Sequence, residues 1–270
     1  MAITRPLTLE AMAGKLNDRS VSGLQFIFVP GSASTSFYMM LFVRRLKKAI
    51  KTLISKDTIL DIPIDGIFKM AGESNIKTFV QIGSNDGKKN DPLHPYIRKN
   101  GWKGILVEPD LANFKKLVNN YSQAGGLIFE NLGIGPVRGE MLFYRLANIT
   151  ELDPGWFDQV GSFDRETFIK NINYGQDLEK RMIAEPLPVI TFEDLLQKNN
   201  FRKVDLLHTD TEGFDYKILR SINFAEHDIR IVLFEGEWMT QYELRELIQY
   251  LRKYNYSIFR CGVDYAGVKV

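Results

Sequence analysis

The sequence contains a single cysteine, Cys261, among 270 residues. One cysteine excludes an internal disulfide and a zinc site built from several thiolates, and we interpret it as a reduced thiol in a cytoplasmic protein. The sequence also lacks an excess of charge of one sign, since 35 basic side chains are matched by 33 acidic ones. Such a balance gives no overall field that attracts nucleic acid, so no nucleic-acid partner is expected.

No hydrophobic run is long and unbroken enough to predict a membrane span. The nearest candidate, residues 24–43, is interrupted by the polar segment 30–36 (Pro-Gly-Ser-Ala-Ser-Thr-Ser). The segment also lacks the apolar core and the small-residue cleavage site of a signal peptide. We therefore interpret it as part of an N-terminal extension.

A basic amphipathic helix is predicted at residues 40–56. Its apolar side chains fall on one helical face, beside five Lys and Arg side chains between residues 44 and 51. This pattern is typical of a helix that covers a soluble domain, and also of one that lies on an anionic membrane surface, so both interpretations stay open. We assign residues 1–65 to the N-terminal extension and residues 66–270 to one α/β domain.

An apolar run, Phe79 to Ile82, stops abruptly at a polar loop, residues 83–87. This is how a buried parallel strand ends beside a ligand. The glycines of the loop, Gly83 and Gly87, allow the backbone to approach a bound molecule. Glu108 ends the next apolar run, twenty-five residues after Gly83. A doubly wound sheet places an acid against ribose hydroxyls at about this distance, so the pattern predicts a cofactor that contains a nucleoside.

Strand and helix patterns alternate along the rest of the chain, which predicts a parallel sheet with right-handed crossovers. Further strands are expected at 103–108, 127–130, 204–210 and 229–235, and a closing hairpin at 256–260 and 265–270. The helix after Asp110 is expected to bury five side chains, those of Leu111, Phe114, Leu117, Val118 and Tyr121. The pattern lapses in an insertion at about 147–188, which is either a substrate-recognition region or an insertion that only packs.

Carboxylates follow several of the predicted strands, and parallel strand ends meet in one crevice. The acids are Asp86, Glu108, Asp210, Glu212 and Glu235. An acid-rich crevice fits a cationic ligand. Phosphate-binding alternatives fit less well, because the loop lacks the third glycine of the dinucleotide motif and the Gly-Lys-Ser/Thr of a nucleotide triphosphate loop. Asp86 would also repel a pyrophosphate.

Four motifs in order resemble those of the FkbM-type methyltransferases, over about residues 76–237. They are Val80-Gln-Ile-Gly-Ser-Asn-Asp-Gly87, Val107-Glu-Pro109, Ile190-Thr-Phe-Glu-Asp-Leu-Leu196 and Asp205-Leu-Leu-His-Thr-Asp-Thr-Glu-Gly213. The resemblance implies a class I methyltransferase fold, a Rossmann-like doubly wound sheet of seven strands with the last antiparallel. It also implies S-adenosylmethionine as cofactor, and usually O-methylation of a sugar or natural-product hydroxyl. The expected partner is therefore a small-molecule or saccharide acceptor.

The resemblance also implies roles for individual residues. Gly83, Ser84 and Gly87 would approach the amino acid part of the cofactor, and Asn85 and Asp86 of the same loop are also expected to bind the cofactor. Glu108 would bind its ribose, and Asn131 and Leu132 would lie near its adenine. The chain departs from the family at His208, where lysine is frequent, and at Asn85-Asp86 in the glycine loop.

His208 and Asp210 lie at the tip of the fourth predicted strand, and Asp210 is also expected to contact the cofactor. Either side chain is a candidate general base for a hydroxyl acceptor, and the alternative for His208 is a purely structural hydrogen bond. Asp210 and Glu212 also resemble oxygen ligands of a divalent metal, but carboxylates on a turn more often bind backbone amides, so no metal is expected. Two other functions stay open: a catalytically silent module that binds cofactor or sugar, and an NAD-dependent oxidoreductase.

Overall fold

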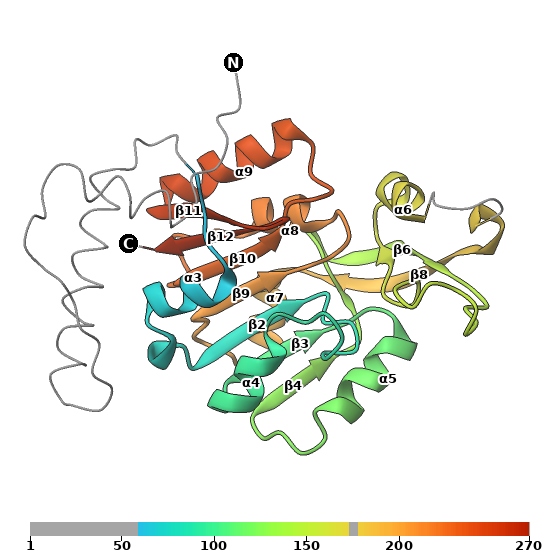
Figure 1. Ribbon diagram of the computed structural model, residues 1–270, viewed down its shortest axis with the longest axis horizontal. Coiled ribbons are helices and arrows are strands. Elements are labelled where there is room, and N and C mark those ends of the chain that lie inside the picture. The colour runs from blue at the N-terminus through green and yellow to red at the C-terminus, as the bar shows by residue number, and fades with distance from the viewer. Residues whose placement is uncertain (1–58, 173–177, 270) are drawn as a thin grey trace, which may run out of the picture.

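The computed structural model describes residues 59–172 and 178–269, and the segments discussed above at 24–43 and 40–56 lie outside these described residues. A mixed sheet of eight strands occupies the centre of the molecule (Figure 1). Across the sheet the strands are β1 (Leu60–Asp61), β11 (Tyr256–Cys261), β12 (Asp264–Lys269), β10 (Ile231–Glu235), β9 (Leu206–Thr209), β2 (Thr78–Ile82), β3 (Lys103–Val107) and β4 (Leu127–Glu130). Among the described helices, none has the length and apolar character needed to cross a membrane.

Seven of these strands form the sheet that the resemblance implied. Strands β4, β3, β2, β9, β10 and β11 run parallel, and β12 runs antiparallel between β10 and β11. This arrangement confirms the class I methyltransferase fold. The eighth strand, β1, pairs in parallel with the edge strand β11. It comes from residues 60–61, within the part of the chain assigned to the N-terminal extension.

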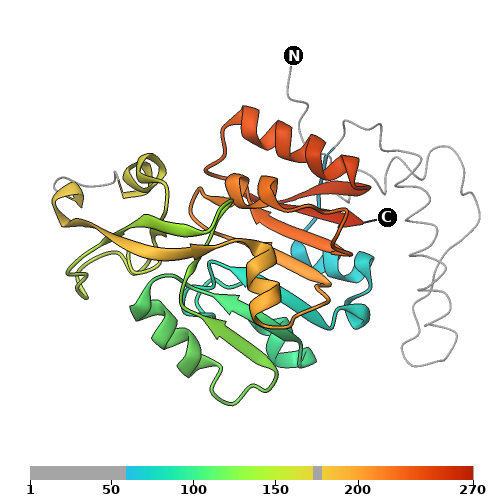
Figure 2. The ribbon, with the colours of Figure 1, turned by 180° about the vertical axis from the view of Figure 1, so that it is seen from behind.

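Helices cover both faces of the sheet, so that the strands lie in a middle layer (Figures 1 and 2). On one face lie α3 (Ile64–Ala71), α4 (His94–Asn100) and α5 (Leu111–Asn120). On the other face lie α7 (Phe192–Lys198), α8 (Asp215–Ser221) and α9 (Gln241–Lys253). Because both faces are buried, the parallel strands are almost continuously apolar, which is why they are recognisable in the sequence.

Several helix ends follow from features of the local sequence. The Asp110 side chain accepts a hydrogen bond from the backbone N–H of Asn113 and begins α5. Capping boxes at Thr191 and Thr240 begin α7 and α9. Gly101 ends α4 with a φ of 61°.

The buried face of α5 is narrower than predicted. Phe114, Leu117 and Tyr121 pack toward the core, but Leu111 is 54% exposed and Val118 is 37% exposed. The three inward side chains are spaced three and four residues apart and already form the face that contacts the sheet. The prediction that Leu111 and Val118 are buried is therefore wrong.

A second sheet of four strands projects from the side of the molecule (Figures 1 and 2). Its strands, in order, are β5 (Gly133–Ile134), β8 (Met182–Ile190), β6 (Gly139–Leu146) and β7 (Gly161–Ser162). The described structure between β7 and β8 includes α6 (Arg165–Ile172) and the short 3-10 helix η2 (Leu178–Arg181). Residues 182–188 of the predicted insertion are therefore strand. Pro186 and Pro188 concealed this, because proline is rare inside a sheet.

Candidate functional site

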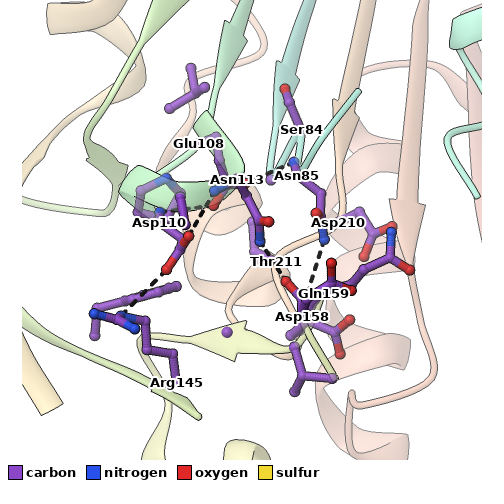
Figure 3. Close-up of a pocket in the computed structure, with 18 of the residues that line it drawn as sticks. Ser84, Asn85, Glu108, Asp110, Asn113, Arg145, Asp158, Gln159, Asp210 and Thr211 are labelled. Carbon is purple, nitrogen blue, oxygen red and sulfur yellow. Dashed lines mark hydrogen bonds and ion pairs between the residues drawn. The ribbon is translucent and has the colours of Figure 1, made fainter. Parts of the chain in front are cut away.

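A cavity of about 640 Å³ lies at the carboxyl ends of β2, β3 and β9. The loops that follow these strands form one side, and residues 149–163, which we name the cover segment, contribute to the other. Figure 3 shows the polar side chains around it. The predicted convergence of the strand ends is present in part. Gly83, Glu108, His208, Asp210 and Glu212 line this cavity, whereas two of the acids expected there, Asp86 and Glu235, do not.

Gly83 allows the ends of β2 and β9 to meet. Its φ is +82°, and a Cβ at this position would lie 1.8 Å from the backbone carbonyl oxygen of Asp210. The backbone N–H groups of Gly83 and Ser84 both donate to the carbonyl oxygen of Val107, at 3.0 and 2.9 Å. We expected this glycine to make room for a ligand, but the atom that needs the space belongs to the neighbouring loop.

The glycine loop divides into two halves. Ser84 and Asn85 line the cavity, whereas Asp86 and Gly87 are not among its lining residues. The Asp86 side chain accepts hydrogen bonds from the backbone N–H groups of Lys88 and Lys89, both at 2.8 Å. A Cβ on Gly87 would meet the side chains of Leu117 and Tyr121. The second half, Asp86 and Gly87, therefore makes contacts within the protein and supports the first half, Ser84 and Asn85, which faces the cavity.

Glu108 is 5% exposed and joins two parts of the site. Its Oε2 accepts a hydrogen bond from the backbone N–H of Asn85, and its Oε1 accepts one from that of Asp110, both at 2.8 Å. Burial raises the pKa of Glu108 to about 8. A carboxylate offers about four lone pairs, so Glu108 still has acceptor capacity toward the cavity.

Asn131 and Leu132, the two residues expected near the adenine, differ in position. Leu132 lines the cavity, but Asn131 is exposed and is not a lining residue. The Asn131 Nδ2 donates to the carbonyl oxygens of Glu108 and Pro109, at 2.9 Å each. Asn131 therefore fixes the backbone after β3, and Leu132 provides the apolar surface.

His208 and Asp210 lie side by side along β9 and its end. His208 is 3% exposed and pairs with Gln81 of β2 and Leu233 of β10. Burial lowers its pKa to about 4, so the imidazole is neutral near pH 7. Asp210 donates its backbone N–H to Ile82, at 3.0 Å. Burial, together with the charge of Glu212, holds the pKa of Asp210 well above its usual range.

The carboxylate of Glu212 faces α6. It accepts a hydrogen bond from the Nδ2 of Asn171 at 2.7 Å, which ties the turn after β9 to that helix. In the parts of the chain that the structure describes, no three or more His, Cys, Asp or Glu side chains are grouped so that they could hold a metal ion.

The cover segment is attached to the loop after β2 by Asn85, and to α5 by residues that the sequence analysis missed, Asn113 and Lys116 (Figure 3). Asn85 donates its Nδ2 to the carbonyl oxygen of Gln159 at 3.1 Å, and Asn113 donates its Nδ2 to that of Asp158 at 2.6 Å. Lys116 forms an ion pair with Asp158 at 2.9 Å. The available signal was weak: Asn113 is an amide at a buried position of an amphipathic helix.

The lining residues fit a ligand that has hydroxyl groups, an apolar ring and a cationic end. Glu108 provides acceptors, Leu132 and Ile134 provide apolar surface, and Asp210 lies at the acidic end. Three lining side chains have a buried atom without a hydrogen-bond partner in residues 59–172 and 178–269, namely the Oε1 of Gln81, the Oδ2 of Asp91 and the Nδ1 of His208. Buried polar atoms of this kind point to a polar ligand or water.

Comparison with known proteins gives one sequence family and several similar folds. Residues 81–258 match the family model of the methyltransferase FkbM domain. No curated protein matches the sequence significantly. The structure is similar to the FkbM methyltransferase from Methylobacillus flagellatus, with 14% identity, a TM-score of 0.47, and coverage of 77% of this chain and 48% of that chain. The chain thus spans about half the length of that protein.

Two other solved structures share the general fold. The N-terminal domain of human METTL16, in complex with S-adenosylhomocysteine, has 11% identity, a TM-score of 0.37, and coverage of 91% of this chain and 73% of that chain. The ribosomal protein L11 methylase from Lactobacillus delbrueckii subsp. bulgaricus has 12% identity, a TM-score of 0.34, and coverage of 92% and 91%. The sequence match, however, extends over well more than half of the 270 residues and includes the glycine loop, Glu108 and Asp210. The chain therefore belongs to the FkbM methyltransferase family, whose cofactor is S-adenosylmethionine.

Proposed function

We propose that the chain is an O-methyltransferase that transfers a methyl group from S-adenosylmethionine to a hydroxyl of a carbohydrate or secondary metabolite. The observation that supports this most is the convergence of Glu108, at the end of β3, with His208 and Asp210, at the end of β9, on one cavity. An acid for a ribose and a candidate base are therefore within the same enclosed space, as a two-substrate transfer requires.

The cofactor would be held by the loops after β2 and β3. Glu108 would accept hydrogen bonds from ribose hydroxyls, and Ser84 and Asn85 would lie beside the amino acid part. Leu132 would pack on the adenine. When bound, S-adenosylmethionine supplies an electrophilic methyl group on a positively charged sulfur.

Asp210 is the stronger candidate for the general base. A raised pKa makes a carboxylate a better proton acceptor, whereas the lowered pKa of His208 makes its imidazole a weaker one. His208 would then position the acceptor or the cofactor through its neutral ring. We interpret the cover segment, together with Phe143 of β6, as the acceptor wall, because Trp156, Phe157 and Phe163 present aromatic surface to the cavity.

The first experiment is isothermal titration with S-adenosylhomocysteine, with NADH and ATP as controls. Micromolar binding of S-adenosylhomocysteine alone supports the proposal, and preferential binding of NADH would support an oxidoreductase. Glu108→Ala should weaken binding by about 30- to 100-fold, because two hydrogen bonds to the buried carboxyl group are lost. Glu140→Ala, a change at an exposed residue of β6, is the control.

Activity is then measured with a panel of hydroxyl acceptors. The panel contains neutral saccharides, small secondary metabolites and an RNA oligonucleotide, because the absence of a nucleic-acid partner stays a prediction. Methylation of RNA alone would contradict the proposed acceptor class. Tight cofactor binding without any methylated product would favour the catalytically silent binding module.

A further inference from the structure

Six acidic side chains in or near the loops at this edge of the central sheet have no basic partner in the described part of the chain. None of them forms an ion pair with Lys, Arg or His within the described ranges 59–172 and 178–269. They are Asp91, Asp210, Glu212, Asp215, Glu235 and Asp264. Asp215 is buried and the other five are half-buried. Acids that are largely removed from water are normally paired, so this arrangement is unusual.

Three of these acids lie in one row across adjacent strands. The register pairs Thr209 of β9 with Phe234 of β10, so Asp210 and Glu235 occupy the next level. Glu235 is paired directly with Asp264 of β12. We name Asp210, Glu235 and Asp264 the acid row. Asp210 lines the cavity, whereas Glu235 and Asp264 are its neighbours across the sheet and do not line it. The residues of the acid row share a sheet face with His208, since Leu233, two residues before Glu235, is the register partner of His208.

Several buried polar atoms around the row have no hydrogen-bond partner in the described residues. Gln81 and His208 are 2% and 3% exposed and line the cavity, and the Gln81 Oε1 and His208 Nδ1 have no partner in the described structure. The Oε2 of Glu235 and the Oδ2 of Asp91 are likewise buried and without a partner there. These atoms call for a ligand that brings donors or positive charge.

The basic side chains that line the cavity cannot neutralise the acid row, because other acids engage them. Lys89 and Lys116 form ion pairs with Asp158, at 3.3 and 2.9 Å. Arg145 lies between Asp110 and Glu185, at 3.3 and 2.7 Å. The carboxyl groups of the acid row therefore have no basic side chain to neutralise them, and each stays either negatively charged or protonated until a cation binds.

Resting on the proposed assignment of this cavity to the cofactor, we propose that the acid row selects the cationic form of that cofactor. The site binds S-adenosylmethionine more tightly than S-adenosylhomocysteine, and it releases protons as it does so. S-Adenosylmethionine carries a sulfonium and an ammonium against one carboxylate, whereas the sulfur of S-adenosylhomocysteine is neutral. The two ligands thus differ by one positive charge and a methyl group.

Protonation of the empty site supports this inference. Burial, reinforced by the neighbouring acids, raises the pKa of Glu235 to about 11, that of Glu212 to about 7 and that of Asp264 to about 6. A cation placed beside such groups lowers their pKa values, so protons leave as it binds. The other titratable groups that face the row are Asp91 before α4, His208 in β9, Glu212 and Asp215 after β9, Glu237 after β10 and Cys261 in β11.

Calorimetry in phosphate and in Tris counts the protons released, because the two buffers differ in heat of ionisation. We expect binding of S-adenosylmethionine to be at least about tenfold tighter than that of S-adenosylhomocysteine, which corresponds to one extra charge at effective protein dielectric. We also expect about one more proton to be released. Sinefungin, in which an amine-bearing carbon replaces the sulfonium, should behave like S-adenosylmethionine, which separates charge from the methyl group.

Glu235→Gln keeps the side-chain shape and removes the charge. This variant should reduce the preference for S-adenosylmethionine over S-adenosylhomocysteine to about threefold or less, and it should lower the number of protons released on binding. Asp264→Asn should act in the same direction, and Glu140→Gln, at an exposed position of β6, should leave both readouts unchanged. Circular dichroism confirms the fold of each variant.

Equal affinities and equal proton counts for the three ligands, in a protein that binds all of them, would overturn the proposal. An unchanged preference in folded Glu235→Gln and Asp264→Asn would also overturn it. If none of the three ligands binds, the assignment of the cavity to the cofactor fails, and this proposal fails with it.

Discussion

Gly83→Ala tests the contact that brings the ends of β2 and β9 together. In the structure, a Cβ at residue 83 would lie 1.8 Å from the carbonyl oxygen of Asp210, and real Cβ atoms essentially never approach closer than 3.0 Å. The added methyl group must therefore displace backbone rather than a flexible side chain. The displaced residue is Asp210, our candidate base.

The expected loss of stability has two parts. A positive φ costs an L-residue about 1 to 2 kcal/mol, and Gly83 has a φ of +82°. Separating the two loops adds to this, so the free energy of unfolding should fall by about 3 kcal/mol or more. Affinity for S-adenosylhomocysteine should also fall, because the movement opens the cavity at its acidic end.

Gly101→Ala is the matched control. Gly101 also has a positive φ, +61°, but a Cβ there would meet nothing within 4 Å, and it does not line the cavity. Urea unfolding should show a loss of only about 1 to 2 kcal/mol for this variant, with unchanged affinity for S-adenosylhomocysteine. If the two variants lose the same stability and bind equally well, the close approach of Gly83 to Asp210 is wrong.

Three further predictions concern the cavity. Asp210→Asn should lower kcat by about 100-fold, and His208→Asn by no more than about tenfold. Since the pKa of His208 is about 4, the plot of rate against pH should show no break from this residue between about pH 5 and 8. A larger loss of kcat in His208→Asn than in Asp210→Asn would make His208 the base. Asn113→Ala removes the 2.6 Å hydrogen bond to the cover segment and should speed dissociation of S-adenosylhomocysteine about tenfold in stopped-flow measurements. Asn119→Ala, at an exposed position of the same helix, should leave the dissociation rate unchanged. Equal dissociation rates in the two variants would show that this hydrogen bond does not retain the ligand. Because burial raises the pKa of Glu108 from its ordinary 4.5 to about 8, the ligand-free folded state holds a proton that the unfolded chain has lost. Its contribution to stability is full below about pH 4.5 and is lost as the pH rises toward about 8. Urea unfolding should show this decline, and Glu108→Gln should flatten it; an unchanged slope would contradict the raised pKa.

Local patterns in the sequence predicted much of the fold correctly. The strand ending at Ile82, the helix cap at Asp110 and the capping boxes at Thr191 and Thr240 each depend on residues within a few positions of one another. The burial pattern of α5 was predicted less well, because Leu111 satisfies a helical period but does not reach the sheet. The helical period of the apolar residues shows which side chains share a face, whereas packing against the sheet determines how many of them are buried.

The same division applies to the candidate site. The sequence by itself determined that acids follow the strands and that a glycine loop comes first, because both are features of short segments. Only the tertiary structure decided that Gly83 faces Asp210, that Asn131 points away from the cavity and that Asp158 is tied to Asn113. These contacts join residues that are between 22 and 127 positions apart. Their geometry depends on strand order and register, which no single segment of the sequence encodes.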